Sequence, residues 1–445
     1  MNAPVFRDLQ DRFKSAKAKI GIIGMGYVGL PLALACVKSG FSLTGFDVDD
    51  DKVNALNQGE SYLKHIPGEG IKKSVENGMM NATSDFSRLS EMDAIIICVP
   101  TPLAPGNEPD LSYVTSTSEV IAKYLRAGQM VVLESTTYPG TTAEVMRPIL
   151  EAGGLKSGTD FYLAYSPERE DPGNPTHETS IIPKVVGGDG DDALKLAQAF
   201  YDKVVVRTVP VSSLDTAEAV KLTENIFRSV NIALVNELKL VYGKMGIDIW
   251  EVIEAAKSKP FGYMPFYPGP GLGGHCIPID PFYLTWRAEQ FGQKTRFIEL
   301  AGEINTAMPG HVVQVLEDAL KQRFDKNLDG AKILILGVAY KKNVDDTRES
   351  PAFVIIETLE DKGAQTAFYD PHVEQIPTTR EHMKLAGRKS IEWDPAAFGD
   401  FDAALICTDH DGVDYETLVK RSLLVVDSRN ATQGNIDPDK NIIRG

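Results

Sequence analysis

The sequence predicts an α/β protein in which two doubly wound units, each a parallel sheet with helices on both faces, are joined by a long central helix. Three observations lead to this prediction. Short apolar runs alternate with helical patterns from residue 19 to about residue 210, and the alternation returns from residue 331. Between them a helical pattern runs from Ser212 to about Glu254 with few turn residues. Strands that alternate with helical segments are typical of parallel sheets.

Length and composition fit a multidomain globular protein. The chain has 445 residues, of which 43% are hydrophobic and 24% are charged, and this length suits two or three domains. The formal net charge of −16 argues against a general nucleic-acid binder, which would carry a basic patch. It leaves an anionic small molecule open, because a few cations and helix N-termini suffice for phosphates.

Targeting signals and metal motifs are not evident in the sequence. The longest apolar runs, such as DAIIICVP, are too short to span a bilayer. The N-terminus lacks the apolar segment of a signal peptide, which predicts a cytoplasmic protein without membrane contact. The four cysteines are scattered and form no CxxC pair, so neither a zinc site nor a disulfide framework is expected, and we expect no metal.

A dinucleotide-binding turn follows the first apolar run, KIGIIG. In GMGYVGLPLALACVKSG, Gly24, Gly26 and Gly29 fit G-x-G-x-x-G, a helical pattern follows, and the next strand, FSLTGFD, ends at Asp47. Gly24 permits the tight turn, Gly26 lets the backbone approach a pyrophosphate, and Gly29 allows close helix–strand packing. Asp47 can accept hydrogen bonds from ribose hydroxyls and would repel a 2′-phosphate, so NAD is favoured over NADP.

Further strands are expected in both units. In the first unit they lie at residues 93–100, 130–136, 161–167 and 183–188, and in the second at 331–341, 366–371, 401–408 and 423–430. Functional residues of parallel sheets gather at the carboxyl ends of strands. In the first unit these ends read VPTP, ESTTYPGT and SPERED.

The second unit resembles a Rossmann domain that holds something other than a dinucleotide. The turn after Gly337 reads VAYKK, so the glycine fingerprint is missing, and Lys341 and Lys342 are placed to meet phosphate. The long helix before it is of the kind that links two units and often forms a dimer face. Helices are expected again from Phe282 to about Phe324. We therefore expect domains at residues 1–212, 213–325 and 326–445.

One cysteine lies in an unusual setting, the loop GPGLGGHCIPIDP at residues 269–281. Cys36, Cys98 and Cys407 lie in apolar patterns and are expected in the core. Cys276 follows glycines and prolines, which form loops, and an accessible loop is where a reactive thiolate is needed. The alternative is a structural loop cysteine.

Six blocks, in order over nearly the whole chain, resemble the UDP-glucose/GDP-mannose dehydrogenase family. They are GIIGMGYVGLPLA, ESTTYPGT, SPERED, VKLTENIFRSVNIALVNE, GPGLGGHCIPIDP and KKNVDDTRESPA. The match is closest to the branch that oxidises UDP-N-acetylhexosamines, with UDP-N-acetylglucosamine the favoured substrate. The resemblance implies two Rossmann-like domains joined by a long helix, a homodimer or higher homo-oligomer, and oxidation of a primary alcohol to a carboxylate with two NAD⁺. It also implies a role in surface polysaccharide biosynthesis, such as that of lipopolysaccharide O-antigen.

The resemblance assigns roles to individual side chains. Cys276 would form a thiohemiacetal and then a thioester with the substrate. Lys221 and Asn225, four residues apart and so on one helix face, would point at the C6 oxygen. Asp280 would help to activate water or orient its neighbours. Residues with an implied catalytic role are Cys276, Lys221, Asn225, Asp280, Glu168 and Thr136.

Binding residues follow in the same way. The cofactor is expected against Gly24, Gly26, Tyr27, Val28, Gly29, Asp47, Thr101, Thr136 and Arg348. The substrate is expected against Glu168, Arg169, Lys221, Asn225, Tyr267, Gly271, Gly273, Tyr340 and Lys341. After S-P-E this chain reads RED rather than the FLRE of the UDP-glucose branch, so Glu168 transfers from the family and the second carboxylate does not.

Several of these assignments have plain structural alternatives. Lys221 and Asn225 could lie on a solvated helix face, and Asp280 could cap the helix that begins near Pro281. Arg348 could pair with Asp345 or Asp346. His275 is more easily explained by a hydrogen bond that fixes the loop than by catalysis. Tyr263, Phe266 and Tyr267 could pack against uracil or make ordinary aromatic contacts.

Rival functions remain open at this point. UDP-N-acetylmannosamine or UDP-glucose could be the substrate instead. A two-electron hydroxyacid or 6-phosphogluconate-like dehydrogenase also joins a Rossmann domain to long helices, but it needs no cysteine. A non-catalytic NAD-sensing protein is the alternative from another class.

Overall fold

The computed structural model describes residues 3–63, 66–169, 181–274, 277–379, 381–433 and 441–445. The chain divides into two compact units. The first unit comprises Met1–Glu224 and Phe282–Lys294, and the second comprises Asn225–Pro281 and Thr295–Gly445. The expected division into three domains at residues 212 and 325 stays a prediction.

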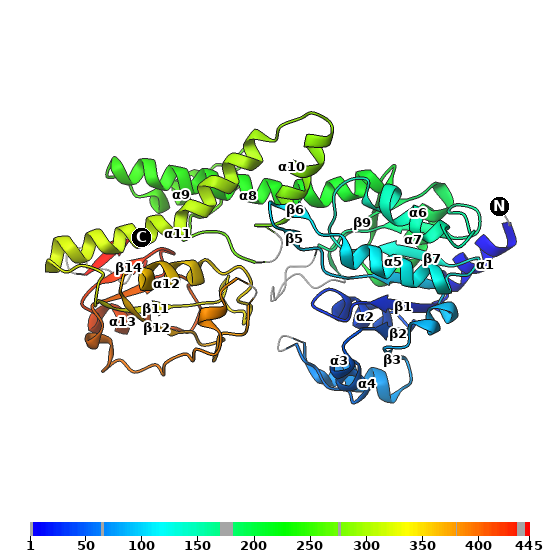
Figure 1. Ribbon diagram of the computed structural model, residues 1–445, viewed down its shortest axis with the longest axis horizontal. Helices are drawn as coiled ribbons and strands as arrows, with labels where there is room; N and C mark the ends of the chain where they lie inside the picture. The colour runs from blue at the N-terminus through cyan, green and yellow to red at the C-terminus, as the bar shows by residue number, and fades with distance from the viewer. Residues whose placement is uncertain (1–2, 64–65, 170–180, 275–276, 380, 434–440) are drawn as a thin grey trace. The chain divides into compact units, whose positions relative to one another are not determined.

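The first unit contains an eight-stranded sheet with the order β10-β9-β8-β7-β4-β1-β2-β3 (Figure 1). Its strands are β1 (Lys19–Ile23), β2 (Ser42–Phe46), β3 (Met80–Thr83), β4 (Ala94–Ile97), β7 (Met130–Leu133), β8 (Tyr162–Tyr165), β9 (Lys184–Gly188) and β10 (Thr208–Pro210). A small hairpin, β5 (Leu103–Ala104) and β6 (Glu108–Pro109), stands apart from this sheet. Every strand predicted in this unit is present, and β3 and β10 are short strands that the apolar pattern did not predict.

Strand direction departs from the prediction at one edge of this sheet. Neighbouring strands are parallel except for β8 and β9, which pair antiparallel with Ala164 opposite Gly188 and Tyr165 opposite Gly187. The expectation of a wholly parallel sheet is therefore wrong for β9 and for β10, which pairs parallel with β9. Antiparallel edge strands are common on otherwise parallel sheets, because the hydrophobic pattern of a strand does not specify its direction. As a result Lys184, the first residue of β9, lies at the edge where β7 and β8 end.

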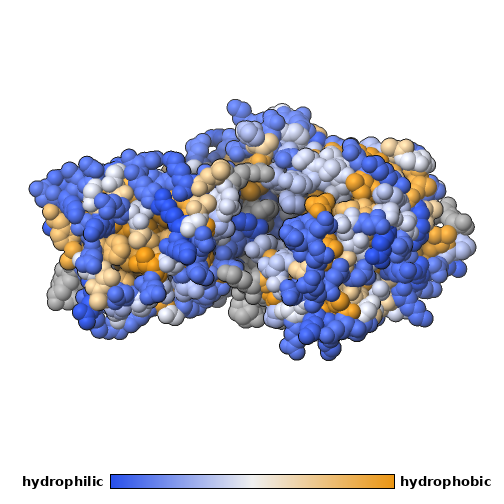
Figure 2. Space-filling model, turned by 60° about the horizontal axis from the view of Figure 1, so that its bottom comes forward, coloured by the Kyte–Doolittle hydropathy of each residue, from blue (hydrophilic) through white to orange (hydrophobic). Residues whose placement is uncertain are grey.

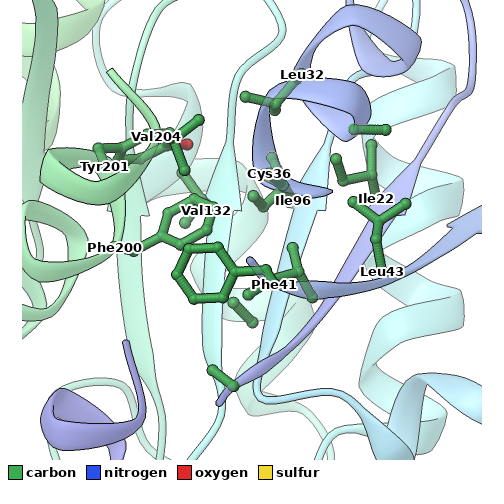
Figure 3. Close-up of a cluster of buried hydrophobic side chains, with 14 of the residues drawn as sticks. Ile22, Leu32, Cys36, Phe41, Leu43, Ile96, Val132, Phe200, Tyr201 and Val204 are labelled. Carbon is green, nitrogen blue, oxygen red and sulfur yellow. The ribbon is translucent and has the colours of Figure 1, made fainter. Parts of the chain in front are cut away.

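Helices cover both faces of this sheet, as predicted, because alternate residues of each strand point to opposite sides. On β4, Ala94 and Ile96 belong to one core, whereas Ile95 and Ile97 belong to the other. The first core, part of which Figure 3 shows, is covered by α1 (Ala3–Lys14), α2 (Gly29–Lys38), α3 (Asp50–Asn57), α4 (Gly68–Glu76) and α7 (Asp191–Val204). The second core is covered by α5 (Ser112–Tyr124) and α6 (Arg147–Glu151).

The long central helix is shorter than the sequence pattern predicted. Helix α8 runs over Leu214–Lys244, and a separate helix, α9, covers Ile249–Lys257. Between them Gly246 has φ of +72°, a conformation that commonly ends a helix. The Asp248 side chain then accepts from the Trp250 amide at 2.9 Å and caps α9. The predicted helical stretch from residue 282 to residue 324 is likewise two helices, α10 (Asp280–Gln290) and α11 (Arg296–Phe324).

The second unit contains a five-stranded parallel sheet with the order β12-β11-β13-β14-β15. Its strands are β11 (Lys332–Leu336), β12 (Gln365–Tyr369), β13 (Ala403–Ile406), β14 (Val425–Asp427) and β15 (Ile442–Arg444). Helices α11 and α12 (Pro351–Asp361) pack on one face, and α13 (Tyr415–Arg421) packs on the other. The four predicted strands are present, and β15 was not predicted.

The second unit repeats the strand–glycine–acid arrangement of the first, but here a histidine also contacts the acid. Gly337 follows β11 with φ of +80°, as Gly24 follows β1 with φ of +89°. Asp370 follows β12 as Asp47 follows β2, and each accepts from the amide of the residue after the glycine, Val338 at 2.7 Å and Met25 at 2.9 Å. Asp370 Oδ2 differs in that it also lies 3.1 Å from His410 Nε2, so a histidine occupies the place beside this carboxylate, which agrees with the missing fingerprint.

The cysteines of the cores behave as predicted. Cys36 and Cys407 are buried, and Cys98 is half-buried against the first core. Burial raises the pKa of Cys36 and raises that of Cys407 to about 12. Both thiols therefore stay protonated and unreactive near neutral pH.

The molecular face in Figure 2 is largely polar, with apolar residues in scattered groups. Such scattered exposure is normal for a globular protein. Within the described ranges, no helix has both the length and the apolar character needed to cross a membrane.

Candidate active site

The glycine turn after β1 has the geometry that a dinucleotide needs. A Cβ on Gly24 would lie 2.5 Å from the Cys98 carbonyl oxygen, and one on Gly29 would lie 2.0 Å from the Gly24 oxygen, so only glycine fits at either position. A Cβ on Gly26 would meet no atom within 4 Å, which leaves the room that a pyrophosphate requires. The N-terminus of α2 follows, with Val28 as its N-cap and no side-chain cap among the described residues. The turn therefore fits NAD, whose phosphates would meet the N-terminus of α2.

Asp47 is buried next to this turn, and its position agrees with a role at the ribose. Its Oδ2 accepts from the Met25 amide at 2.9 Å and its Oδ1 accepts from the Asp49 amide at 3.1 Å, so the carboxylate is held in one orientation. Two residues close to Asp47 and the glycine turn were not predicted from the sequence. Lys52 Nζ lies 3.9 Å from Asp47 Oδ2, and the Tyr62 hydroxyl donates to the Met25 carbonyl.

Replacing Asp47 with alanine should reduce the preference for NAD⁺ over NADP⁺ by roughly 10- to 100-fold, the value of a hydrogen bond to a charged group. The variant loses a ribose acceptor and the charge that repels a 2′-phosphate, while Lys52 remains as a cation. The measurement is the ratio of kcat/KM for the two cofactors. Asp50→Asn removes an equal charge from an exposed position three residues away and should leave the ratio unchanged. An unchanged ratio in Asp47→Ala would show that discrimination lies elsewhere.

The segments that follow β4 and β7 are joined at the carboxyl edge of the sheet. Thr101 is buried, whereas Thr136 is half-buried. The Ser135 hydroxyl donates to the Val99 carbonyl at 2.6 Å, and the hydroxyl of Tyr283 on α10 donates to the Thr101 carbonyl. The edge therefore presents both predicted threonines from a fixed backbone. Tyr283 supports this backbone and was not singled out from the sequence.

Glu168 and Arg169 follow β8 at the same edge, and each already has partners. Glu168 Oε2 lies 3.4 Å from Lys184 Nζ. The Arg169 guanidinium donates to Glu224 on α8, with Nη2 at 2.6 Å and Nε at 3.3 Å, and its Nη1 donates to the Pro183 carbonyl at 2.7 Å. A substrate contact of Arg169 stays a prediction, and its present bonds tie the SPER segment to α8.

Glu218 fixes α8 to the loop after β7. Its carboxylate accepts from the Gly140 amide at 2.7 Å, from the Thr142 amide at 2.9 Å and from the Thr142 hydroxyl at 2.6 Å. Burial raises the pKa of Glu218 to about 7. Lys221 lies one turn further along α8 and is 8% exposed. The alternative of a fully solvated helix face therefore does not describe Lys221.

Asn225 and Asp280, which are 55 residues apart, meet in the second unit. Asn225 Nδ2 donates to Asp280 Oδ2 at 2.5 Å, and both side chains are buried. Asp280 is also the first residue of α10, where a carboxylate is favoured by the helix dipole. The catalytic and the helix-stabilising interpretations of Asp280 are therefore compatible.

The glycine loop before Cys276 packs against the turn that follows β11. The Gly274 amide donates to the Arg348 carbonyl at 3.1 Å. A Cβ on Gly273 would lie 2.8 Å from the Tyr340 Cβ, and one on Gly271, whose φ is +143°, would lie 3.0 Å from Pro351. These glycines are thus needed for close backbone packing within the second unit. Their predicted contact with substrate remains a prediction.

The remaining predicted residues of the second unit have local partners. Tyr267 stacks on Trp250 with ring centroids 5.7 Å apart, and its hydroxyl donates to Glu254 at 2.7 Å. Arg348 pairs with Asp346, the ion pair considered as an alternative from the sequence. Lys341 Nζ lies 5.9 Å from the centroid of the Tyr340 ring.

Two basic residues near the glycine loop were missed from the sequence. Arg429 follows β14. A Cβ on Gly269 would lie 2.5 Å from Arg429 Nη1, and Arg429 Nε donates to the Cys407 carbonyl at 2.9 Å. The strand-end rule, applied to DSRN, could have found it. Lys239 on α8 is buried, and burial, followed by the charge of Arg429, lowers its pKa to about 8. No sequence signal marks Lys239, which lies inside a helical pattern.

His275 and Cys276 lie outside the described residues, so the structure does not place the predicted nucleophile. Among the described residues, no group of three or more His, Cys, Asp or Glu side chains could hold a metal ion.

Family models cover most of the chain in three consecutive segments. Residues 18–205 match the NAD binding domain of the UDP-glucose/GDP-mannose dehydrogenase family, residues 215–307 match its central domain, and residues 334–434 match its UDP binding domain. The chain belongs to this family. It is therefore an NAD-dependent oxidoreductase that acts on a nucleotide sugar, and its UDP binding domain indicates a UDP-sugar.

Individual members of the family are similar over most of their length. The chain is 36% identical to the UDP-N-acetyl-D-glucosamine 6-dehydrogenase of Pseudomonas aeruginosa over 82% of this chain and 85% of that protein. It is 35% identical to the UDP-N-acetyl-D-mannosamine dehydrogenase of Pyrococcus horikoshii over 93% and 95%. The solved structure of the UDP-D-ManNAc dehydrogenase from Pyrococcus horikoshii superposes with a TM-score of 0.85, at 33% identity and with 95% and 98% of the two chains covered.

Proposed function

We propose that this dehydrogenase oxidises the C6 alcohol of UDP-N-acetylglucosamine to the uronic acid through a covalent intermediate on Cys276. NAD⁺, when bound, supplies the hydride acceptor for both oxidations, and two NAD⁺ are consumed for each sugar. The product is an activated uronic acid donor of the kind that surface polysaccharide assembly uses.

The cysteine divides the second oxidation into two manageable steps. The first hydride transfer and loss of the hydroxyl proton convert the alcohol to an aldehyde. The Cys276 thiolate adds to the aldehyde carbon and gives a thiohemiacetal, which loses a hydride and a proton to become a thioester. Water then attacks the thioester, the carbon–sulfur bond breaks, and the carboxylate and the thiol are released. Cysteine suits this route because it is both a good nucleophile and a good leaving group.

Charge at the C6 oxygen has to be stabilised in each step. Lys221 carries an ammonium group and Asn225 an amide, and donors held in place before the reaction stabilise developing oxyanion charge. Asp280 orients the Asn225 amide through the 2.5 Å hydrogen bond. Glu168 and Thr136, at the strand ends of the first unit, are assigned to the water that cleaves the thioester.

The observation that carries this proposal is the contact between Asn225 and Asp280. Both were assigned to catalysis from the sequence, they lie 55 positions apart, and Asp280 follows Cys276 by four residues in the chain. A buried amide and carboxylate in contact, one of them four residues from the nucleophile in sequence, are the donor and base that the two-step route needs.

The choice of an N-acetylhexosamine rests on relatives and on two local segments. The relatives from Pseudomonas aeruginosa and Pyrococcus horikoshii are named for UDP-N-acetylglucosamine and UDP-N-acetylmannosamine respectively. SPEREDPGN replaces the sequence of the UDP-glucose branch, and GPGLGGHCIPIDPFYLTW resembles the N-acetylglucosamine branch. We favour the gluco epimer on the second segment and keep the manno epimer as the alternative.

UDP-N-acetylglucosamine should therefore be oxidised with a much higher kcat/KM than UDP-glucose. A pocket shaped for an acetamido group leaves its donor and acceptor unpaired when a hydroxyl binds, which can reduce kcat/KM by up to about 10⁴-fold. The measurement compares UDP-N-acetylglucosamine, UDP-N-acetylmannosamine, UDP-N-acetylgalactosamine and UDP-glucose under one set of conditions, with NADH as the readout. The galacto epimer, in which one hydroxyl changes direction, is expected to react slowly.

The same panel separates the rival functions. Two NADH per sugar support the four-electron route, whereas one NADH would indicate a single oxidation. If UDP-glucose or the manno epimer has the highest kcat/KM, the gluco assignment is wrong and only the reaction type stands. NAD binding without turnover on any of the sugars would support a sensing role instead.

We also propose that two copies associate through α8 in the second unit. Phe227, Leu234 and Val241 recur every seven residues, and each is 48–49% exposed. Met245 and Ile247, just beyond them, are 64% and 42% exposed. An apolar stripe with seven-residue spacing is typical of a helix that packs against another helix. Sedimentation equilibrium would contradict the proposal if the protein sediments as a monomer at micromolar concentration.

A further inference from the structure

A buried group of charged side chains lies behind Glu168 in the first unit. It exists because β9 runs antiparallel to β8. The register that pairs Ala164 with Gly188 and Tyr165 with Gly187, continued by three residues, brings Lys184 opposite Glu168. If β9 ran parallel to β8, its first residue would instead lie near the residues where β7 and β8 begin.

Lys184 bridges two carboxylates. Its Nζ donates to Glu134 Oε2 at 2.8 Å and to Glu168 Oε2 at 3.4 Å. The side chains of Lys184, Glu134 and Glu168 are 5%, 0% and 13% exposed. The second oxygen of Glu134 accepts from the Tyr201 hydroxyl, and that of Glu168 accepts from the Arg169 amide at 2.6 Å. All four carboxylate oxygens therefore have a donor.

This arrangement does more than neutralise a buried lysine. Glu134 alone would balance the charge of Lys184, because the two are fully buried and directly bonded. Lys184 nevertheless also contacts Glu168, which is the least buried of the three and lies at the strand end where functional residues gather. Glu134 and Tyr201 are placed behind Lys184 and hold its ammonium toward Glu168.

We propose that Lys184 is a positioning residue. It keeps the carboxylate of Glu168 ionised and in one orientation, so that Glu168 can act on the water that hydrolyses the thioester. This inference rests on the proposed function, in which Glu168 acts during thioester hydrolysis. Lys184 itself does not touch the substrate in this scheme. It acts through Glu168, with Glu134 and Tyr201 as its supports.

The titratable groups around Lys184 come from five elements. They are Glu134 after β7, Glu168 after β8, Tyr201 on α7, Cys98 after β4 and Cys36 on α2. Figure 3 shows Tyr201 and Cys36 among the buried side chains of the first core. Burial raises the pKa of both cysteines and of Tyr201, so all three are neutral near pH 7. Burial alone would lower the pKa of Lys184, but Glu134 and Glu168 outweigh it and the pKa is raised.

Removing the ammonium group of Lys184 should change the pH dependence of the enzyme's activity. Burial, followed by the charge of Glu168, already raises the pKa of Glu134. Without Lys184 the two carboxylates would lose their shared cation, and the protonated form of Glu168 would become easier to populate. Loss of an opposite charge at hydrogen-bonding distance raises the pKa of a carboxyl group. Activity that needs ionised Glu168 would then disappear at a higher pH.

The test compares Lys184→Met, Lys184→Arg and the double variant Glu134→Gln/Lys184→Met in the full-length enzyme. We expect Lys184→Met to lower kcat by about 10- to 100-fold, less than the roughly 10²–10⁴-fold of losing a general acid or base itself, because Glu168 remains in place. KM for the UDP-sugar should change by less than about threefold, because uniform binding is unaffected. The acid limb of the kcat–pH profile should move up by about one unit or more. Lys184→Arg keeps the positive charge, so the acid limb of its kcat–pH profile should lie close to that of the wild type.

The double variant separates positioning from folding. It removes both charges of the buried pair, so it should fold even if Lys184→Met, which leaves Glu134 alone, does not. If its kcat and acid limb match those of the wild type, Lys184 is structural and the inference is overturned, whatever happens to the Tm. If the wild-type enzyme oxidises none of the UDP-sugars, the proposed function fails first, and that outcome is distinct from an active wild type with unaffected variants.

Discussion

Replacing Cys276 with alanine is expected to abolish formation of the uronic acid while leaving NAD binding nearly unchanged. The thioester exists only through the cysteine sulfur, so no other side chain can carry the second oxidation. The first hydride transfer does not need the thiol, so at most one NADH per bound sugar should appear. The measurement combines NADH stoichiometry, product analysis of the sugar nucleotide and NAD titration.

Cys407→Ala provides the matched control for this experiment. Cys407 is buried, and its pKa of about 12 keeps it protonated, so its loss affects packing and not chemistry. The control should retain two NADH per sugar, although its Tm should fall because a buried side chain is shortened. Full two-step turnover by Cys276→Ala would exclude the covalent route.

Lys221→Ala is expected to lower kcat by about 10²–10³-fold, the usual cost of losing one oxyanion donor. KM for the sugar should change far less, because the ammonium acts on charge that develops in the transition state. The burial of Lys221 on α8, one turn from the anchored Glu218, supports a preorganised group rather than a mobile surface lysine. Steady-state kinetics with saturating NAD⁺ measures both constants.

Lys244→Ala is a suitable control on the same helix. Lys244 is exposed at the end of α8, so its replacement removes an equal charge without touching the buried segment. It should leave both kcat and KM close to the wild-type values. If Lys221→Ala raised KM strongly and kept kcat, Lys221 would bind the ground state and its catalytic assignment would be wrong.

Local sequence predicted elements whose conformation depends on few residues. The turn at Gly24 was predictable because only glycine tolerates its positive φ and because a Cβ there would lie 2.5 Å from the Cys98 carbonyl oxygen. The strands were predictable because continuous apolar runs are needed where a sheet is covered on both faces. The break between α8 and α9 was missed, although Gly246 and Asp248 mark it, because one glycine in a long helical pattern does not by itself decide a helix end.

The candidate site was predictable only in part. Asn225 and Asp280 were each assigned through the family resemblance, and the structure shows that they are hydrogen-bonded. Arg429 was missed because, in the second unit, functional residues were sought only in the turn after Gly337. Glu218 and Lys239 carry no sequence signal, because a charged residue in a helical pattern is usually solvated and burial depends on what packs against it.

The sequence by itself determined the α/β class, the dinucleotide turn and the family, because each depends on residue types at short, fixed spacings, and on the same basis it predicted the nucleophilic cysteine. Tertiary structure alone decided the direction of β9, and with it the position of Lys184. An apolar run has the same pattern whether its strand pairs parallel or antiparallel, since direction is set by hydrogen bonds to a neighbour distant in sequence. The antiparallel register placed an ammonium 3.4 Å from Glu168, where a parallel strand would have left this carboxylate without its cation.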